Sequence, residues 1–471
     1  MGGRVLRRVL VAFALALGVV GASAKKRELP PDVLTALARA HVPADAISVL
    51  VQDPADGRVL LQWRADEPVN PASLFKLVTT YAALELLGPA WAWSTPVWLH
   101  GRVEGGVLEG DLVIKGSGDP KLVHERLWLL LRRVQQLGVR EIRGDIVLDR
   151  SVFVAPEVSP ADFDGEGHRP YNVRADALLF NFKSLLLTFT PDLERKQARV
   201  SVEPALAGVQ VDPTVALSNG PCDDWRGALR ADFADPLRIR FAGSYPASCL
   251  ERVWPIAHAD PRGYNARAIE GLWQELGGRL TGKVREGAAP QLVAPTFEVV
   301  SPPLADLVRD INKYSNNVMA QQLFLTLGVM QRGAGTPEAA RASVRSWMTE
   351  KLGVEAAGQV LIDNGSGLSR DARISARSLA RLLTLAWASP VMPELLSSLP
   401  VSGLDGTLRR SAAPLGRAHL KTGSLRDAAG VAGYVLGAGG RRVVLVAIVN
   451  HPNANAARPA FDALVQRVGA D

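Results

Sequence analysis

Residues 70–76 read Asn-Pro-Ala-Ser-Leu-Phe-Lys, and they lead into an apolar run that ends at Gly88. Asn70 suits a helix N-cap and the proline after it suits the first helical position, so this stretch predicts a helix. Positions i and i+3 share one helix face, which brings the amine of Lys76 within reach of the Ser73 hydroxyl. With Asn70 as the cap, Ser73 lies in the first turn, where its backbone N–H has no partner within the helix.

A serine and a lysine placed in this way are typical of nucleophilic catalysis. The hydroxyl is the nucleophile, the amine is its base, and the serine N–H supplies half of an oxyanion hole. Lysine suits the role of base, because burial and a nearby cation can lower its pKa until it is neutral, whereas arginine stays charged. Alone the Ser-x-x-Lys pattern is weak, since residues 23–26 also match it and an exposed helix could carry both residues by accident.

Two further short motifs follow, and each occurs once in the chain. Residues 315–317 read Ser-Asn-Asn, a Ser-x-Asn motif on a segment that reads as a helix or its edge. Residues 421–424 read Lys-Thr-Gly-Ser on a predicted strand. Only 11 of the 54 basic residues are lysines, so chance rarely places two of them in motif positions.

In this order the three motifs match the set found in class A β-lactamases and penicillin-binding proteins. The first two motifs lie 242 residues apart and the last two 106, whereas a compact β-lactamase needs far less chain before its second motif. The chain therefore resembles the class C low-molecular-mass penicillin-binding proteins, the D-alanyl-D-alanine carboxypeptidase/endopeptidase family. The other stretches that look like this family, which extend the resemblance over essentially the whole mature chain, are 110–120, 144–153, 363–370, 405–408 and 419–425.

The resemblance implies a role for each motif. Ser73 would attack the carbonyl of the penultimate D-Ala while Lys76 takes its proton, and water would then hydrolyse the acyl-enzyme. Ser315 and Asn317 would pass the proton to the leaving amine and hold the substrate amide. The substrate-binding residues that the resemblance implies are Lys421, Thr422, Gly423 and Ser424, with the terminal carboxylate on Lys421 and Thr422 and the oxyanion on the N–H groups of Ser73 and Ser424.

The resemblance also implies the partners, which are peptidoglycan stem peptides and their cross-links. Penicillins mimic the D-Ala dipeptide, so β-lactam antibiotics would acylate Ser73 and leave slowly. Arg370 and Arg426 follow motif segments and could meet the acidic end of a stem peptide, but ordinary solvated charges explain them nearly as well. The preference between the terminal D-Ala and the cross-link stays open, as does the oligomeric state.

The expected fold class is α/β (α+β), a transpeptidase-like domain with an antiparallel sheet flanked by helices and a β-rich insertion. Residues 25–94 and 258–471 form the expected catalytic domain, and 95–257, which read as short strands rich in Gly and Pro, form the insertion. The resemblance implies two nested subdomains there. The main expected helices are 31–40, 266–276, 304–325, 337–352, 376–388 and 459–468, and the main strands are 46–52, 58–63, 110–114, 144–148, 185–189, 418–425, 431–436 and 441–449.

Residues 1–24 follow the pattern of a secretory signal peptide. Arg4, Arg7 and Arg8 precede an uncharged run that ends in Ala-Ser-Ala at residues 22–24. The run has 16 residues, fewer than the roughly 20 that span a bilayer. We therefore expect cleavage after Ala24 and an exported, periplasmic protein without an integral membrane segment. The net charge of +7 comes from interleaved acidic and basic residues, and the absence of a basic block argues against nucleic acid as a partner.

The cysteines and histidines carry the remaining expectations. Cys222 and Cys249 are the two cysteines of an exported chain, so we expect a disulfide that stabilises by roughly 3 kcal/mol. The seven histidines include no His-Glu-x-x-His motif or close pair, and no metal or other cofactor is expected. No Gly-x-Ser-x-Gly elbow is present. The open alternatives are a serine β-lactamase and a non-catalytic protein that binds muropeptides or β-lactams.

Overall fold

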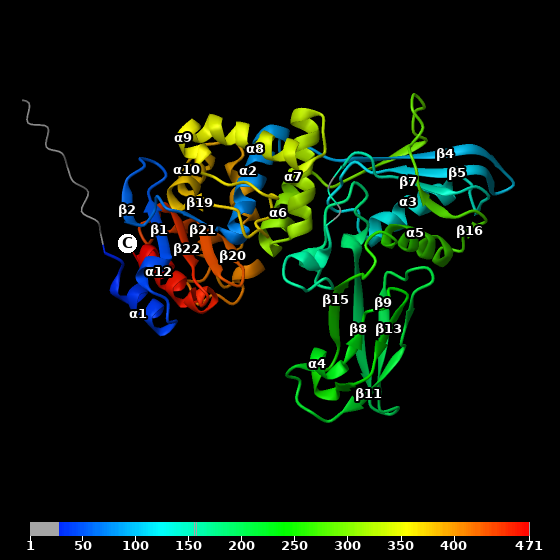
Figure 1. The fold of residues 1–471 in the computed structure, drawn as a ribbon, viewed down its shortest axis with the longest axis horizontal. Helices are drawn as coiled ribbons and strands as arrows, with labels where there is room; N and C mark the ends of the chain where they lie inside the picture. The colour runs from blue at the N-terminus through cyan, green and yellow to red at the C-terminus, as the bar shows by residue number, and fades with distance from the viewer. Residues whose placement is uncertain (1–27, 155, 157, 471) are drawn as a thin grey trace, which may run out of the picture.

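The computed structural model describes residues 28–154, 156 and 158–470, and the expected signal peptide lies outside these residues. Two regions lie side by side in Figure 1. Both ends of the chain build the outer region, residues 28–93 and 301–470, and the middle of the chain builds the inserted region, residues 94–300. In the part of the chain that is described, none of the helices has the length and apolar character needed to cross a membrane.

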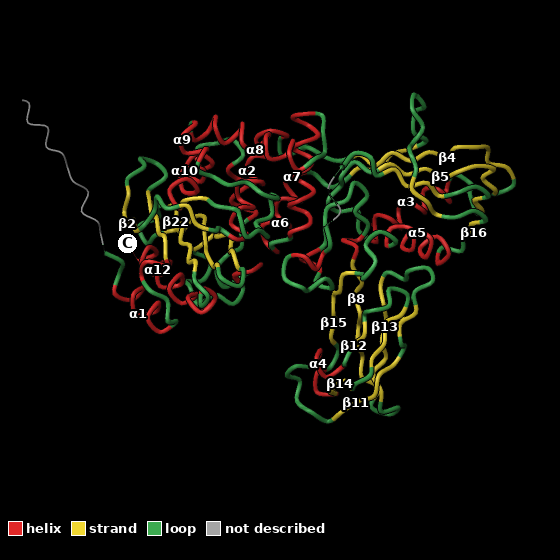
Figure 2. Tube along the Cα trace, viewed as in Figure 1, coloured by secondary structure: helices red, strands yellow, loops and turns green. Residues whose placement is uncertain are grey.

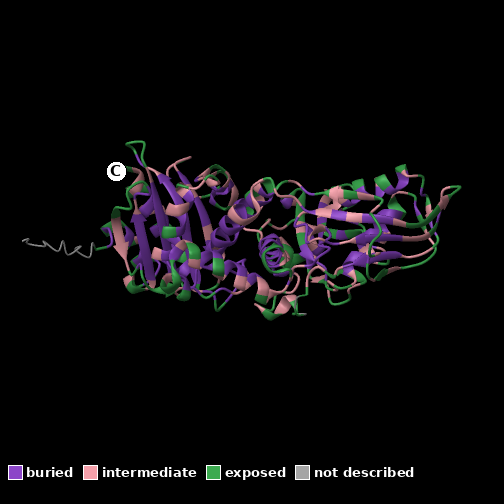
Figure 3. Ribbon diagram, turned by 90° about the horizontal axis from the view of Figure 1, so that it is seen from above, coloured by how far each residue is buried: buried purple, intermediate pink, exposed green. Residues whose placement is uncertain are grey.

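An antiparallel sheet forms the centre of the outer region. Its strands in spatial order are β2 (Val59–Trp63), β1 (Ile47–Gln52), β22 (Arg442–Asn450), β21 (Ala428–Leu436) and β20 (Ala418–Ser424). β22 is an almost continuous apolar run because both of its faces are buried. Val444 and Val446 pack into one core, and Leu445 and Ala447, which point the other way, pack into a second core. Figure 3 shows the buried strands of this sheet. The predicted hairpin and C-terminal strands are confirmed.

Helices cover both faces of the sheet (Figure 1). On one face lie α1 (Pro31–Arg39) and α12 (Arg458–Ala470). On the other face lie α2 (Phe75–Leu87), α6 (Leu304–Tyr314), α7 (Asn317–Arg332), α8 (Pro337–Leu352), α9 (Val354–Gly358), α10 (Ala376–Trp387) and α11 (Met392–Ser398), with the short strand pair β3 (Pro68–Val69) and β19 (Ile374–Ser375). α2 is buried over most of its length, which explains why its sequence is apolar all round.

The helix of the first motif begins later than the sequence predicts. Residues Ala72–Leu74 form a 3₁₀ turn, η2, and α2 begins only at Phe75. The Asn70 side chain does accept a hydrogen bond from the Ala72 N–H (2.9 Å), but Ala72 has a φ of 48°, which an α-helix does not allow. Ser73 therefore lies in the turn before α2 and not in its first turn.

The segment of the second motif is also broken where one helix was expected. Ser315 ends α6 in a left-handed conformation, with a φ of 56°. Asn316 then caps α7, because its side chain accepts a hydrogen bond from the Met319 N–H (3.1 Å). The predicted helix 304–325 is thus two helices, and the corner between them presents Ser315 and Asn317.

The inserted region begins and ends in one sheet. Its strands are β16 (Arg279–Leu280), β6 (Glu141–Ile142), β5 (Val107–Lys115), β4 (Ser94–Glu104) and β18 (Phe297–Val300) in spatial order, with β7 (Ile146–Asp149) between β5 and β17 (Val284–Glu286). α5 (Tyr264–Glu275) packs into the core of this region. Because β18 pairs with β4, residues 264–300 belong to the insertion, and the expected boundary at 257/258 moves to about Val300.

The inserted region is less purely β than its composition predicts. α3 (His124–Gln136) covers the first sheet, and it buries Leu127, Leu130, Leu131 and Val134, which recur at helical spacing. This helix was not predicted from the sequence, because the many Gly and Pro residues around it favour short strands and turns.

A second sheet is nested within the insertion and extends below the first sheet in the view of Figures 1 and 2. Its strands are β14 (Ser244–Pro246), β11 (Thr214–Ser218), β9 (Gln197–Glu203), β8 (Ser184–Asp192) and β15 (Arg252–Ala257), beside β10 (Gln210–Val211), β13 (Arg238–Phe241), β12 (Ala231–Asp232) and α4 (Trp225–Leu229). The Cys222–Cys249 disulfide lies here, as expected.

Candidate active site

The three motifs meet at one cleft of about 560 Å³. Ser73 comes from η2, Ser315 and Asn317 come from the corner between α6 and α7, and Ser424 comes from the end of β20. These segments are far apart in the sequence. The sequence-predicted residues are therefore brought together by the fold, and the two lysines of the motifs lie buried behind them.

Lys76 is the buried partner of Ser73. Its Nζ lies 2.9 Å from Ser73 Oγ, and it donates to Asn317 Oδ1 and to the backbone oxygen of Ser366, each at 2.6 Å. When the amine is neutral, the Ser73 hydroxyl can donate across the same 2.9 Å, which is the direction in which a base removes the proton. The geometry thus suits proton transfer from Ser73 to Lys76.

Burial lowers the pKa of Lys76 well below its ordinary value, and the positive charge of Lys421 lowers it further. The side chain has no exposed surface. Among the described residues no carboxylate forms an ion pair with it, so nothing there offsets the cost of burying its charge. The neutral amine, which is the form that acts as a base, is accordingly favoured.

Lys421 is equally buried but has different neighbours. Its Nζ donates to Ser315 Oγ (2.8 Å) and to the backbone oxygen of Thr422 (2.7 Å). Burial lowers the pKa of Lys421 to about 7. Near neutral pH this lysine is therefore poised between a cation, which attracts a carboxylate, and a neutral amine.

Gly423 allows η2 to approach β20 closely. A Cβ at this position would lie 2.8 Å from the Pro71 oxygen and 3.2 Å from a Leu74 side-chain carbon. Any larger residue would push the turn that carries Ser73 away from the strand. Beside the glycine, the Ser424 hydroxyl donates to Asn455 Oδ1 (2.6 Å), which holds the end of the strand.

Several contributors to the site come from outside the motifs, and most act through the backbone. The Ser366 oxygen that contacts Lys76 lies in a glycine turn, in which a Cβ on Gly367 would lie 1.9 Å from the Ala72 oxygen. The oxygen of Tyr171 accepts a hydrogen bond from Asn317 Nδ2 (3.0 Å). This bond turns Oδ1 of the amide toward Lys76. Because every residue has a backbone carbonyl group, these two contacts could not be predicted from residue types. Residues 363–370 are nevertheless among the stretches that resemble the family.

The two arginines proposed as stem-peptide contacts both line the cleft. Arg370 donates to the Phe163 oxygen (2.9 Å), and its guanidinium lies 4.9 Å from the centre of the Phe163 ring. Arg426 is exposed at the end of β20. Within the described residues, no group of three or more His, Cys, Asp or Glu side chains is placed to hold a metal ion.

Comparisons with known proteins agree with this geometry. Residues 31–469 match the model of the D-Ala-D-Ala carboxypeptidase 3 (S13) family. The chain is 29% identical over 468 residues to a D-alanyl-D-alanine carboxypeptidase of Actinomadura sp. (strain R39), which covers 94% of this chain and 85% of that protein.

Solved structures share the fold. Penicillin binding protein 4 (dacB) from Haemophilus influenzae superposes with a TM-score of 0.74 at 23% identity, over 92% of this chain and 99% of that one. Its complex with a β-lactam gives a TM-score of 0.69 over the same shares, also at 23% identity. The Bd0816 predatory endopeptidase from Bdellovibrio bacteriovorus gives 0.53 at 14% identity, over 89% of this chain and 92% of that one.

The fold is thus that of penicillin-binding proteins and serine β-lactamases, with an insertion between the first two motifs. The family match covers nearly all of the described chain, and it includes all three motifs. The chain belongs to the D-Ala-D-Ala carboxypeptidase 3 (S13) family of low-molecular-mass penicillin-binding proteins, which are serine peptidases.

Proposed function

We propose that the chain is an exported, periplasmic D-alanyl-D-alanine carboxypeptidase that also cleaves D-Ala cross-links, through an acyl-enzyme on Ser73. The observation that carries the proposal is the Lys76 amine, which is buried without a carboxylate and lies 2.9 Å from the Ser73 hydroxyl. A relative of the chain is named as such a carboxypeptidase, and the Bdellovibrio endopeptidase shares the fold.

In this mechanism Lys76 removes the proton of Ser73 as Oγ forms a bond to the carbonyl carbon of the penultimate D-Ala. The N–H groups of Ser73 and Ser424 stabilise the oxyanion. Ser315 relays the proton from Lys76 to the leaving amine as the C–N bond breaks, and Asn317 holds the substrate amide. Water then attacks the ester, and the released acid and the free Ser73 hydroxyl complete the cycle.

Substrate recognition follows from the remaining motif residues. Lys421, in its cationic form, and the hydroxyl of Thr422 bind the terminal carboxylate. Arg370 and Arg426 contact the stem peptide at the edges of the cleft. β-Lactams carry a carboxylate and a reactive amide in a similar arrangement, so they acylate Ser73; the Haemophilus protein has been solved with such a compound.

Labelling with a fluorescent penicillin tests the proposal. Wild-type protein should form a stable adduct on the peptide that contains Ser73, and it should release D-Ala from a pentapeptide muropeptide. Ser73→Ala should abolish both, because no other group replaces the nucleophile. Ser201→Ala, an exposed serine on β9 in the nested sheet, is the matched control and should change neither.

The same measurements separate the alternatives. Rapid hydrolysis of nitrocefin would mean that the chain is a β-lactamase. Protein that neither takes up penicillin nor releases D-Ala would be a non-catalytic binder. Unchanged labelling of Ser73→Ala would refute the assignment of the nucleophile.

A further inference from the structure

A second cleft of about 930 Å³ adjoins the first and has no role in the mechanism above. It lies between the outer region, with α7, α8 and residues 363–371, and the inserted region, with residues 158–175 and 259–262. Phe163, Leu368 and Arg370 line both clefts. A peptide chain that leaves the active site past these three side chains therefore enters the second cleft.

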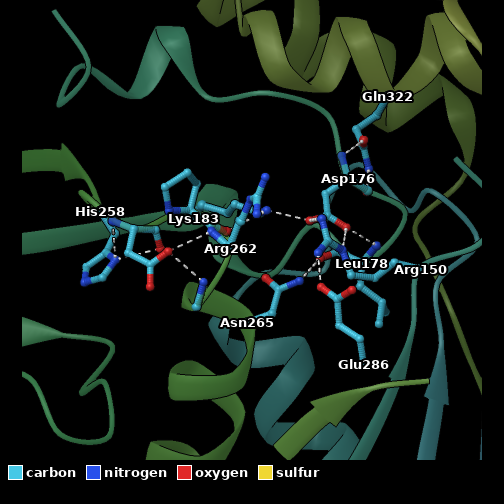
Figure 4. A network of polar contacts seen from close by, with 12 residues as sticks. Arg150, Asp176, Leu178, Lys183, His258, Arg262, Asn265, Glu286 and Gln322 are labelled. Atoms are coloured by element: carbon cyan, nitrogen blue, oxygen red, sulfur yellow. Dashed lines mark hydrogen bonds and ion pairs between the residues drawn. The ribbon is translucent and has the colours of Figure 1, made fainter. Parts of the chain in front are cut away.

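Three basic side chains of this cleft already pair with carboxylates. Figure 4 shows Arg150 and Lys183 converging on Asp176, whose carboxylate is fully buried. Arg150 Nη2 and Lys183 Nζ lie 2.8 and 2.5 Å from Asp176 Oδ2. Arg341 pairs with Glu338 at 2.5 Å. These three cations therefore already have carboxylate partners from the chain itself.

Unlike these paired cations, two other side chains of the cleft have a hydrogen-bond donor that lacks an acceptor. Gln321 on α7 is only 7% exposed, yet its Nε2 has no partner among the described residues. The Nε of Arg174 is buried without a partner as well, and Arg174 forms no ion pair in the described part of the chain. Its one recorded bond is a long contact from Nη2 to the Ser159 oxygen (3.5 Å). Donors buried without acceptors are costly, so an acceptor that reached these two side chains would be bound favourably.

The two donors lie on chain segments that run beside each other, Gln321 on α7 and Arg174 on residues 171–176. Residues 171–176 are tied to this helix at both ends: Tyr171 accepts from Asn317, and the backbone of Asp176 exchanges two hydrogen bonds with the Gln322 side chain (2.8 and 2.9 Å). Arg174 lies between the two ties on the segment, and Gln321 lies between them on the helix. Both also line the second cleft.

We propose that Arg174 and Gln321 bind a carboxylate of the wall peptide that lies outside the D-Ala–D-Ala unit reacting with Ser73. This inference rests on the proposed function and specifies its substrate. A carboxylate fits because guanidinium N–H groups pair with it in a planar, charge-assisted arrangement, and the neutral amide of Gln321 adds a further donor. The shared wall lets one peptide occupy both clefts. The second cleft thus selects peptides with a free carboxylate beyond the scissile bond.

Kinetics with a cross-linked muropeptide dimer test the proposal, in two forms of the dimer that have free or amidated peptide carboxylates. Arg174→Gln and Gln321→Leu should each lower kcat/KM for the free-acid dimer, by about 10- to 100-fold for the arginine, as expected for a hydrogen bond to a charged group. Amidation should lower kcat/KM of the wild type by a similar factor but should leave that of Arg174→Gln nearly unchanged. Arg199→Gln, an exposed arginine on β9, is the matched control.

The rate of acylation by fluorescent penicillin, which fills the catalytic cleft alone, separates binding from folding. It should stay within about 2-fold of wild type in both variants, a difference well below 1 kcal/mol. Equal losses with penicillin and with the dimer would show that Arg174 and Gln321 only support the catalytic cleft. Variants that cleave both forms of the dimer as wild type does would show that the second cleft binds no carboxylate. If the wild type cleaves no muropeptide, the proposed function itself fails.

Discussion

The catalytic cleft and the interior of the inserted region both bury cationic side chains, but the surroundings of these cations differ. In the cleft, Lys76 and Lys421 are fully buried, and their hydrogen-bond partners among the described residues are hydroxyl, amide and carbonyl oxygens. In the inserted region, Lys183 and Arg150 share the buried carboxylate of Asp176 (Figure 4).

This difference distinguishes cations that stabilise the fold from lysines that can act in catalysis or binding. A buried cation beside a carboxylate keeps its charge, and the pair joins two segments of the chain. A buried lysine without a carboxylate has its pKa lowered, as both Lys76 and Lys421 do, and it becomes available as a base or as a binding group for an incoming carboxylate. Lys313, two residues before Ser315, also has a carboxylate partner, because it pairs with Asp405 at 2.6 Å.

The largest expected effect comes from replacing each of the two cleft lysines by arginine. Lys76→Arg should lower the rate of penicillin acylation by about 10³-fold, since a guanidinium cannot become neutral and general-base catalysis is lost. Lys421→Arg should lower it by only about 10-fold, because a fixed cation still attracts the carboxylate. Labelling rate constants measure both, and thermal unfolding of each variant checks its fold. Equal losses would contradict the division between base and binding group.

The three motifs could be predicted from the sequence because their chemistry requires particular side chains. The fold then brings Lys76 within hydrogen-bond distance of Ser73 and Asn317, and it brings Lys421 within hydrogen-bond distance of Ser315. Likewise, the apolar pattern of a fully buried strand identified β22.

What the sequence did not reveal depends on tertiary contacts. The left-handed Ala72, which delays the start of α2, packs its oxygen against the glycine turn at Gly367, some 300 residues away in the chain. The oxygens of Ser366 and Tyr171 act regardless of their side chains. The end of the insertion was misplaced because α5 has an amphipathic pattern that would suit either region, and only the pairing of β18 with β4 assigns it.

The next largest effect concerns the carboxylate of the inserted region. Asp176→Ala leaves Lys183 and Arg150 without their shared counter-ion, and Lys183 is only 7% exposed. Breaking a buried ion pair in this way should lower the free energy of unfolding by about 3–5 kcal/mol. Urea unfolding followed by tryptophan fluorescence measures the loss.

Asp66→Ala is the matched control, because Asp66 pairs with Arg377 at the surface and is 72% exposed. An exposed pair contributes about 0–1 kcal/mol, so this variant should unfold almost as the wild type does. Adding Lys183→Met to Asp176→Ala should recover part of the lost stability, since it removes the buried charge that has lost its carboxylate, whereas Arg150 still pairs with Glu286. If Asp176→Ala and Asp66→Ala lose the same small amount, the carboxylate is not what allows the inserted region to bury its cations.

The smallest effect is a pH dependence that distinguishes the two cleft lysines without replacing the base. As pH falls through the lowered pKa of Lys76, this amine becomes protonated and kcat/KM falls on the acid side. As pH rises through the pKa of Lys421, about 7, that side chain loses its charge and kcat/KM for a peptide with a free terminal carboxylate falls, by about 10-fold one pH unit above the pKa.

In Lys421→Arg the alkaline fall should vanish and the acid fall should remain. A substrate whose terminal carboxylate is esterified should likewise show no alkaline fall with the wild-type enzyme, because it does not need the cation. Should the alkaline fall persist in Lys421→Arg, a group other than Lys421 sets it, and the assignment of Lys421 as the carboxylate-binding cation would be wrong.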